Sequence, residues 1–217
     1  MIKLFEQYNN EKKIQSFCSK YFISNYEINP DGSIDVNGDV DIDGQGFSKI
    51  PIKFNKVTGD FDCANNKLTT LENCPIEVNG SFSVDFNELT SLDGGPKYVG
   101  KTYSCRWNKL TSLKSIPDTI NMSLNCSNNK ITTLIDFPKS IRESLYMNYN
   151  PISIIDNSII VGKSIHIENT NFTNNIIYLD KEKLRILFEN AIDYNIYHPS
   201  GEIYYNRLER LFKDFNI

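Results

Sequence analysis

Acidic residues near the start of the sequence have the types and spacing of a calcium-binding loop. Asp39, Asp41 and Asp43 precede Gly44 in the segment GDVDIDG, which matches the opening of an EF-hand loop. Such a loop requires a bidentate carboxylate at its twelfth position, and Ile50 occupies that position here. The flanking residues also have the pattern of strands rather than helices. We therefore interpret the aspartates as outward residues of a strand, and the sequence predicts no metal site.

Cysteine and histidine are the other residues with the chemistry of a nucleophile or a metal ligand. The 217-residue chain has two histidines, His166 and His198, and neither has a Cys or Ser partner at a recognisable catalytic spacing. It has five cysteines, none of them in a C-x-x-C pair: Cys18, Cys63, Cys74, Cys105 and Cys126. An odd number of cysteines is typical of a chain that stays in a reducing compartment. A phosphate-binding loop is also missing, so the sequence predicts no enzyme and no cofactor.

Composition limits the classes of partner. The formal net charge is −4, whereas a nucleic-acid-binding face needs an excess of basic residues, so a nucleic-acid partner is disfavoured. No window approaches eighteen apolar residues, and we expect no membrane span. Glu6, Glu11 and Lys12 interrupt the N-terminal segment, which lacks the apolar centre of a signal peptide. We expect a cytoplasmic protein, with a monomer favoured.

One residue pattern recurs every 21 residues over about a hundred residues, and it determines the fold class. Each repeat has two alternating apolar positions, an asparagine, two leucine positions and a proline. The columns are Phe61, Phe82, Tyr103, Leu124 and Leu145; Cys63, Val84, Cys105, Cys126 and Met147; Asn66, Asn87, Asn108, Asn129 and Asn150; Leu68, Leu89, Leu110, Ile131 and Ile152; Leu71, Leu92, Leu113, Leu134 and Ile155; and Pro75, Pro96, Pro117 and Pro138.

Each repeat predicts one coil of a solenoid. The alternating apolar positions predict a short strand with one inward face. The asparagine turns the chain, and its amide, buried at that corner, can satisfy backbone groups and form a ladder with its equivalents in other coils. The leucines and the Pro-x-x-Val/Ile segment close the coil on the convex side. Because one coil cannot bury its own apolar row, the coils must stack, and the cysteine column becomes part of the core.

These repeats resemble leucine-rich repeats of the short class found in bacterial effector proteins. The segments CANNKLTTLENCP and CSNNKITTLIDFP are in particular similar to those of leucine-rich-repeat proteins encoded by large tailed phages. The resemblance implies a scaffold that binds other proteins. Some effectors with similar repeats carry a ubiquitin-ligase domain with a nucleophilic cysteine, but no segment here is long enough to be that domain.

The predicted fold class is a leucine-rich-repeat solenoid of parallel β coils with α-helical caps at both ends. Residues 1–38 are expected to form an N-terminal cap, a helix with an apolar stripe from Leu4 to Tyr21 and then a β-hairpin. Residues 39–173 are expected to form about seven coils, the last shortened by one residue. Residues 174–217 are expected to form a helical cap with the stripe Leu184, Leu187, Phe188 and Ala191.

Alternation along the strands also predicts which side chains point outward on the concave face. The residues just before the ladder asparagines run along its edge, and a coil spacing of about 4.8 Å makes Phe86 and Trp107 neighbours. Two interpretations stay open: these rings pack on each other to cover the edge, or they anchor a protein partner. The candidate partner-binding residues are Asp60, Asp62, Asp85, Phe86, Arg106, Trp107, Tyr146, Asn148 and Tyr149.

We therefore expect a non-catalytic protein–protein interaction module. The phage resemblance implies a host or anti-phage defence protein as partner, in the host bacterial cytoplasm. One alternative is a structural or assembly component of a virion. A second alternative, a small-molecule or nucleotide binder or an enzyme, has no motif in its favour.

Overall fold

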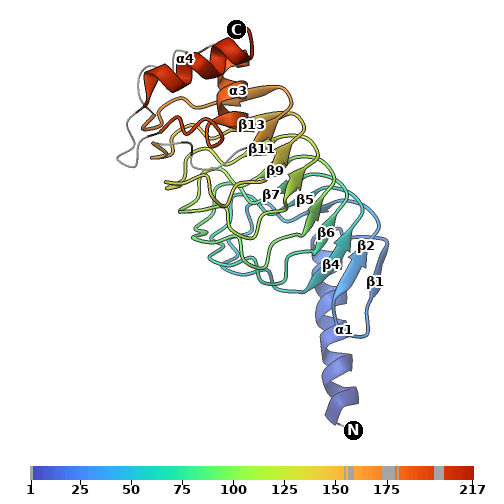
Figure 1. The fold of residues 1–217 in the computed structure, drawn as a ribbon. Helices are drawn as coiled ribbons and strands as arrows, with labels where there is room; N and C mark the ends of the chain where they lie inside the picture. The colour runs from blue at the N-terminus through green and yellow to red at the C-terminus, as the bar shows by residue number, and fades with distance from the viewer. Residues whose placement is uncertain (1, 154, 156–158, 173–178, 180, 198–202) are drawn as a thin grey trace.

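In the part of the chain that the structure describes, a stack of parallel coils lies between an N-terminal helix and two C-terminal helices (Figure 1). The computed structural model describes residues 2–153, 155, 159–172, 179, 181–197 and 203–217, and the side chains in this part except those of residues 2–7 and 181. The predicted fold class, a parallel solenoid with helices at both ends, is confirmed.

Seven short parallel strands form one continuous sheet, in the order β15-β13-β11-β9-β7-β5-β3. Residues that pair in neighbouring strands are separated by 21 positions in the sequence, as Val40 and Phe61 are. In the last pair of strands, Leu145 and Ile165 are separated by 20. Six turns of the chain therefore join the seven strands. The strands are β3 (Val40–Asp41), β5 (Phe61–Asp62), β7 (Phe82–Ser83), β9 (Tyr103–Ser104), β11 (Leu124–Asn125), β13 (Ser144–Tyr146) and β15 (Ser164–His166). We call the outward face of this sheet the floor.

The Pro-x-x-Val/Ile segments form further strands that the repeat pattern did not predict, and these strands continue from the predicted N-terminal hairpin. They make a five-stranded sheet, β1-β2-β4-β6-β8, and a three-stranded sheet, β10-β12-β14. At the first edge, β1 and β2 pair antiparallel as a hairpin. Beyond the hairpin, these strands are two to four residues long, and each exists because it pairs with its neighbour in the next coil. They are β1 (Tyr26–Ile28), β2 (Ile34–Val36), β4 (Phe54–Val57), β6 (Glu77–Val78), β8 (Tyr98–Val99), β10 (Thr119–Ile120), β12 (Ser140–Ile141) and β14 (Ile160–Val161).

The apolar columns of the repeat fill one continuous core. Phe61 and Phe82 stack with ring centroids 5.9 Å apart, and the Tyr103 ring lies 5.1 Å beyond Phe82. The cysteine column is fully buried, at Cys63, Cys105 and Cys126. Since each row continues into the next coil, a coil without neighbours would expose its whole apolar row to water.

Buried asparagines hold the corners of five successive coils. In one of them, Asn87 Nδ2 donates to the carbonyl oxygens of Cys63, Val84 and Asp85 at 3.1, 3.2 and 3.1 Å. Asn87 Oδ1 accepts the Leu68 N–H at 2.9 Å. One side chain thereby satisfies four buried backbone groups from two coils. The ladder consists of Asn66, Asn87, Asn108, Asn129 and Asn150.

The N-terminal helix, α1 (Ile2–Lys20), contacts the first coils through its C-terminal half. The buried Phe17 ring lies 6.1 Å from Phe47 and 6.4 Å from Phe54. Tyr8, expected on the covering face, is instead half exposed, and the start of the helix points away from the coils (Figure 1). The helix is longer than the end of the solenoid can cover, so the expected apolar stripe covers less than predicted. The side chains of residues 4 and 5 lie outside the described part.

At the other end of the described stack, α3 (Lys181–Asn190) packs on the last strands, β14 and β15, and α4 (Tyr205–Asp214) packs on α3. The stripe expected on α3 is buried, and Phe188 packs 6.0 Å from Phe172 of the last coil. Within this cap, the segment HPSGE at residues 198–202, whose sequence favours a turn, lies outside the described residues. Among the residues that the structure describes, no helix is long and apolar enough to cross a membrane.

We expect Asn87→Ala to lower the free energy of unfolding by about 2–3 kcal/mol, because the buried Leu68 N–H loses its acceptor and three carbonyl oxygens each lose one donor. The control is Asn125→Ala, whose Oδ1 accepts one bond, from the Ser127 N–H at 3.2 Å. We expect this control to lose about 1 kcal/mol or less. Urea unfolding followed by circular dichroism measures both. Equal losses would contradict a special role for the ladder.

Candidate functional site

The cysteine thiols are too buried to act as nucleophiles. Burial raises the pKa of Cys63 and Cys105 well above the usual range of a thiol, and it raises the pKa of Cys18 to about 11. These groups are therefore neutral thiols at physiological pH. In the described part of the chain, no group of three or more His, Cys, Asp or Glu side chains is placed to hold a metal ion.

His166 lies on the floor at the C-terminal end of the seven-stranded sheet. Its ring stacks on Tyr146 with centroids 4.3 Å apart and planes 9° apart. Its Nε2 lies 3.0 Å from Ser164 Oγ, which lies 2.8 Å from Ser144 Oγ. The imidazole is thus held flat against the tyrosine ring within a polar surface. His198 lies outside the described residues.

Phe86 and Trp107 form an exposed stack at the edge of the floor, which we call the aromatic ridge. Their ring centroids are 5.6 Å apart and their planes differ by 10°. Phe86 is 41% exposed and Trp107 is 51% exposed. Both interpretations left open by the sequence therefore have a basis, because the rings pack on each other and still present apolar area to water.

The backbone under the ridge has a conformation that aromatic residues rarely adopt. The φ angle is 53° at Phe86, 56° at Trp107 and 57° at Tyr149. A left-handed backbone costs a residue with a Cβ about 1–2 kcal/mol, and glycine and asparagine accept it most readily. The corner geometry therefore explains glycine and asparagine in this column but not its three aromatics. The other positions in the column are Gly44, Asn65, Asn128 and Asn169, all with positive φ.

A buried carboxylate fixes an arginine beside the ridge. Asp85 is 6% exposed and accepts three hydrogen bonds, from Arg106 Nε at 2.6 Å, the Arg106 N–H at 2.9 Å and Ser104 Oγ at 2.6 Å. The guanidinium carbon of Arg106 lies 5.4 Å from the centre of the Phe86 ring. Arg106 therefore places a cation against the aromatic ridge. Asp85 itself is nearly covered, so its role at this surface is to orient Arg106.

The remaining aromatic candidate at the edge stands apart from the ridge. Tyr149 is 53% exposed and lies two coils beyond Trp107, with Asn128 between them. Next to it, Asn148 Oδ1 accepts the Glu168 N–H at 2.8 Å, which ties two neighbouring coils together. Tyr149 and Asn148 therefore do not share one contiguous apolar surface with Trp107.

Aspartates occupy the first two coils of the floor. Asp39 Oδ1 accepts the Asp60 N–H at 2.8 Å, and Asp62 Oδ1 accepts the Ala64 N–H at 2.9 Å. Burial raises the pKa of Asp62, and the nearby charges of Asp43 and Asp41 raise it further. The carboxylates therefore repel one another, and this corner of the floor is negative. The acidic corner consists of Asp39, Asp41, Asp43, Asp60 and Asp62.

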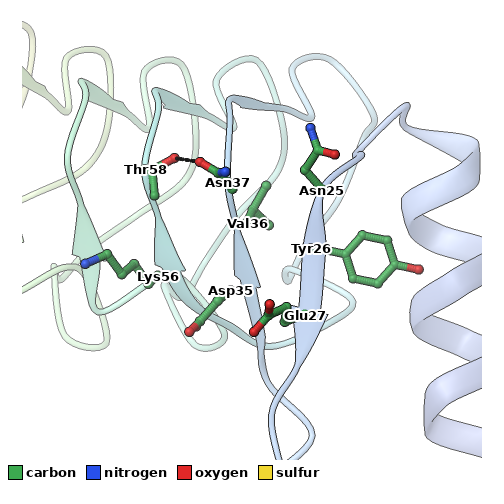
Figure 2. A pocket seen from close by; sticks show the side chains of 8 residues that line it. All are labelled: Asn25, Tyr26, Glu27, Asp35, Val36, Asn37, Lys56 and Thr58. Atoms are coloured by element: carbon green, nitrogen blue, oxygen red, sulfur yellow. Dashed lines mark hydrogen bonds between the residues drawn. The ribbon is translucent and has the colours of Figure 1, made fainter.

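The structure also shows a depression that the sequence did not indicate, over β1, β2 and β4 (Figure 2). Its volume is about 450 Å³. Two of its charged groups already bind other residues of the chain: Lys56 pairs with Glu77 at 2.7 Å, and Asp35 Oδ1 accepts from Asn55 Nδ2 at 2.7 Å. It was missed because the sequence predicted the hairpin of β1 and β2 but not the neighbouring strand β4. It is lined by Asn25, Tyr26, Glu27, Asp35, Val36, Asn37, Lys56 and Thr58.

The stacked coils, the asparagine corners and the leucine columns define a leucine-rich-repeat solenoid. One solved structure similar to this chain is the leucine-rich-repeat domain of a Shigella effector, with 19% sequence identity and a TM-score of 0.45. The similarity covers 63% of this chain and 71% of that chain. No protein-family model matches the sequence, and no curated protein matches it. The class therefore follows from the coils themselves.

We expect Trp107→Asn to change the free energy of unfolding by less than about 1 kcal/mol. The variant loses the stack on Phe86, worth about 0.5–1.5 kcal/mol. It gains a residue suited to a left-handed backbone, worth about 1 kcal/mol. Urea unfolding measures the balance.

Tyr149→Asn is the matched comparison, because Tyr149 has no ring stack within the described part of the chain. We expect it to raise the free energy of unfolding by about 1 kcal/mol. If Trp107→Asn instead loses about 3 kcal/mol or more, as truncation of a buried aromatic does, the ridge is part of the core.

We expect the native protein to resist thiol alkylation at pH 8. The folded-state pKa of Cys63 and Cys105 is raised, so these thiols stay protonated, and burial blocks the reagent at all five cysteines. All five cysteines should react in urea, as counted by mass spectrometry. Fast labelling of the native chain would show that the coils open readily.

Proposed function

We propose that this chain is a non-catalytic protein-binding module whose binding surface is centred on the aromatic ridge and Arg106. The observation that carries the proposal is that Phe86 and Trp107, each about half exposed, occupy backbone positions that favour glycine or asparagine. Because the rings are about half exposed, core packing does not require them, and the local backbone preference disfavours them. The aromatic residues at these positions are therefore explained by a role other than the stability of the free chain, and binding to a partner is such a role.

The composition of this surface also suits a protein contact. Tryptophan and arginine are enriched among interface residues whose removal weakens binding most. Asp85 holds Arg106 in place before binding, which reduces the conformational entropy lost in the complex. The floor beside the ridge carries small residues, Ser83 and Ser104, that let a partner approach the rings.

We propose the class of partner from the amino-acid sequence of the repeats. Because the repeats resemble those of leucine-rich-repeat proteins from large tailed phages, we propose a phage-encoded protein that acts in the cytoplasm of the host bacterium. The partner is then a host or anti-phage defence protein, which the module sequesters or redirects.

Affinity capture from a bacterial lysate, followed by reconstitution with the purified partner, tests this proposal. The baits are the wild type, Phe86→Asn/Trp107→Asn, and the control Ile76→Ser/Tyr98→Ser, which removes two exposed apolar side chains away from the floor. We expect the wild type and the control to capture the same protein. With purified components, the ridge variant should bind at least about tenfold more weakly.

Circular dichroism and urea unfolding of each bait establish that the variants are folded. Equal affinity of a folded ridge variant and the wild type would place the binding surface elsewhere. Capture of no protein by any bait would contradict the proposed function.

A further inference from the structure

We infer that the segment bound at the aromatic ridge is an extended, positively charged stretch of a protein chain that runs along the floor toward the acidic corner. This inference rests on the proposed function and specifies the chemistry of the partner. One apolar side chain of the segment lies on the ridge, and Lys or Arg side chains lie over the aspartates.

Uncompensated negative charge on the first coils is the first support. Asp85 is neutralised by Arg106 at 2.6 Å, and Asp60 lies 3.5 Å from Lys101 Nζ. Among the ion pairs of the described residues, none joins a cation to the other four floor aspartates, which are Asp39, Asp41, Asp43 and Asp62. Neighbouring carboxylates without counter-charges produce a negative potential that attracts a basic partner.

The surface on the other side of the ridge is positively charged, and this determines on which side of the ridge a basic segment binds. Lys67, Lys109 and Lys130 follow the asparagine ladder on that side and are exposed. Glu88 lies in the same row between Lys67 and Lys109 and pairs with Lys109 at 2.9 Å, so three lysines and one glutamate leave this row with a net positive charge. A basic segment is repelled by this side and attracted by the floor, so the charges select one of the two sides of the ridge.

The spacing of the coils sets the spacing of side chains in the segment. With about 4.8 Å between coils, the centre of the ridge lies roughly 7 Å from the coil of Asp62 and roughly 12 Å from the coil of Asp41. In an extended chain, side chains on one face are about 6.6 Å apart. An apolar residue on the ridge therefore places the residues two and four positions away over these two coils. The flexible stems of Lys and Arg cover the remaining offset.

The apolar anchor follows from the ridge itself. Trp107 and Phe86 leave about half of their surface uncovered, and Ser83 and Ser104 beside them are small. A partner side chain that covers both rings gains apolar burial, and an aromatic or long aliphatic residue fills this space best.

A display library of random twelve-residue peptides, selected on the immobilised full chain, tests the inference without assuming the partner. We expect enriched peptides with an aromatic or long aliphatic residue and with Lys or Arg two and four positions away. A selected peptide without tryptophan is then titrated into the protein while the fluorescence of Trp107, the only tryptophan, is recorded.

Two double variants separate the parts of the claim. Asp41→Asn/Asp62→Asn removes charge yet keeps the acceptor, because Asn125 in the same column makes the same bond to the N–H two residues on, at 3.2 Å. We expect this variant to bind the selected peptide about tenfold more weakly and with less dependence on salt. Phe86→Asn/Trp107→Asn should lose binding at every salt concentration, as measured by anisotropy of a labelled peptide.

The outcomes distinguish this inference from the proposed function. Enriched peptides that need the ridge but are not basic, or that bind the Asn variant equally well, overturn the basic segment and leave the ridge as a binding surface. Enriched peptides that bind without the ridge overturn both. A library that yields no specific peptide overturns the inference of an extended segment.

Discussion

The hydrogen bonding of the buried asparagine amide at each corner is the interaction on which the rest of this structure depends. A coil of about 21 residues builds strands of only two to four residues, so most of its backbone groups have no partner within the coil. Asn87 and its equivalents take up the groups left at the tightest bend, and each bonds to the coil before it as well as to its own. The same amide therefore closes one coil and fixes its position on the next, which keeps the apolar columns in line.

This corner also determines where an unusual surface can appear. To bring the amide inward, the preceding residue takes a positive φ, and its side chain points out at the edge of the floor. Asparagine at positions 65 and 128 adopts the positive φ with little loss of conformational free energy. Phe86 and Trp107 adopt it with a larger loss and remain about half exposed. The solenoid thus offers a regular series of outward positions, and the aromatics at two consecutive ones create a local apolar surface on a rigid backbone.

Much of the fold could be predicted from the sequence because each column holds one chemical type. Leucine at 68, 89 and 110 and asparagine at 66, 87 and 108 repeat so regularly that the coils and their core follow directly. The strands of the Pro-x-x-Val/Ile segments could not be predicted, because two-residue strands such as Glu77–Val78 exist only through pairing with the next coil. The length of α1 beyond its contacts was also missed, since periodicity in a helix does not reveal where its support ends.

The candidate site was less predictable than the fold. Alternation and coil spacing indicated that Phe86 would lie beside Trp107. They did not indicate that Asp85 is almost covered, because burial there depends on Ser104 and Arg106 closing over it. The left-handed corner had a signal in the sequence: Gly44, Asn65, Asn128 and Asn169 share its column. Interpreting that column as a backbone requirement would have marked the aromatics in it as exceptions.

Fluorine NMR of the single tryptophan tests most directly whether the ridge is a binding surface. A chain grown with 5-fluorotryptophan gives one resonance, from Trp107, whatever tryptophans the partner contains. If the aromatic ridge binds the partner, we expect this resonance to shift on addition of the partner and to become shielded from a paramagnetic reagent in solution, because the complex buries the exposed half of the ring. If calorimetry shows that a partner binds while the Trp107 resonance keeps its position and its accessibility, the aromatic ridge is not the binding surface.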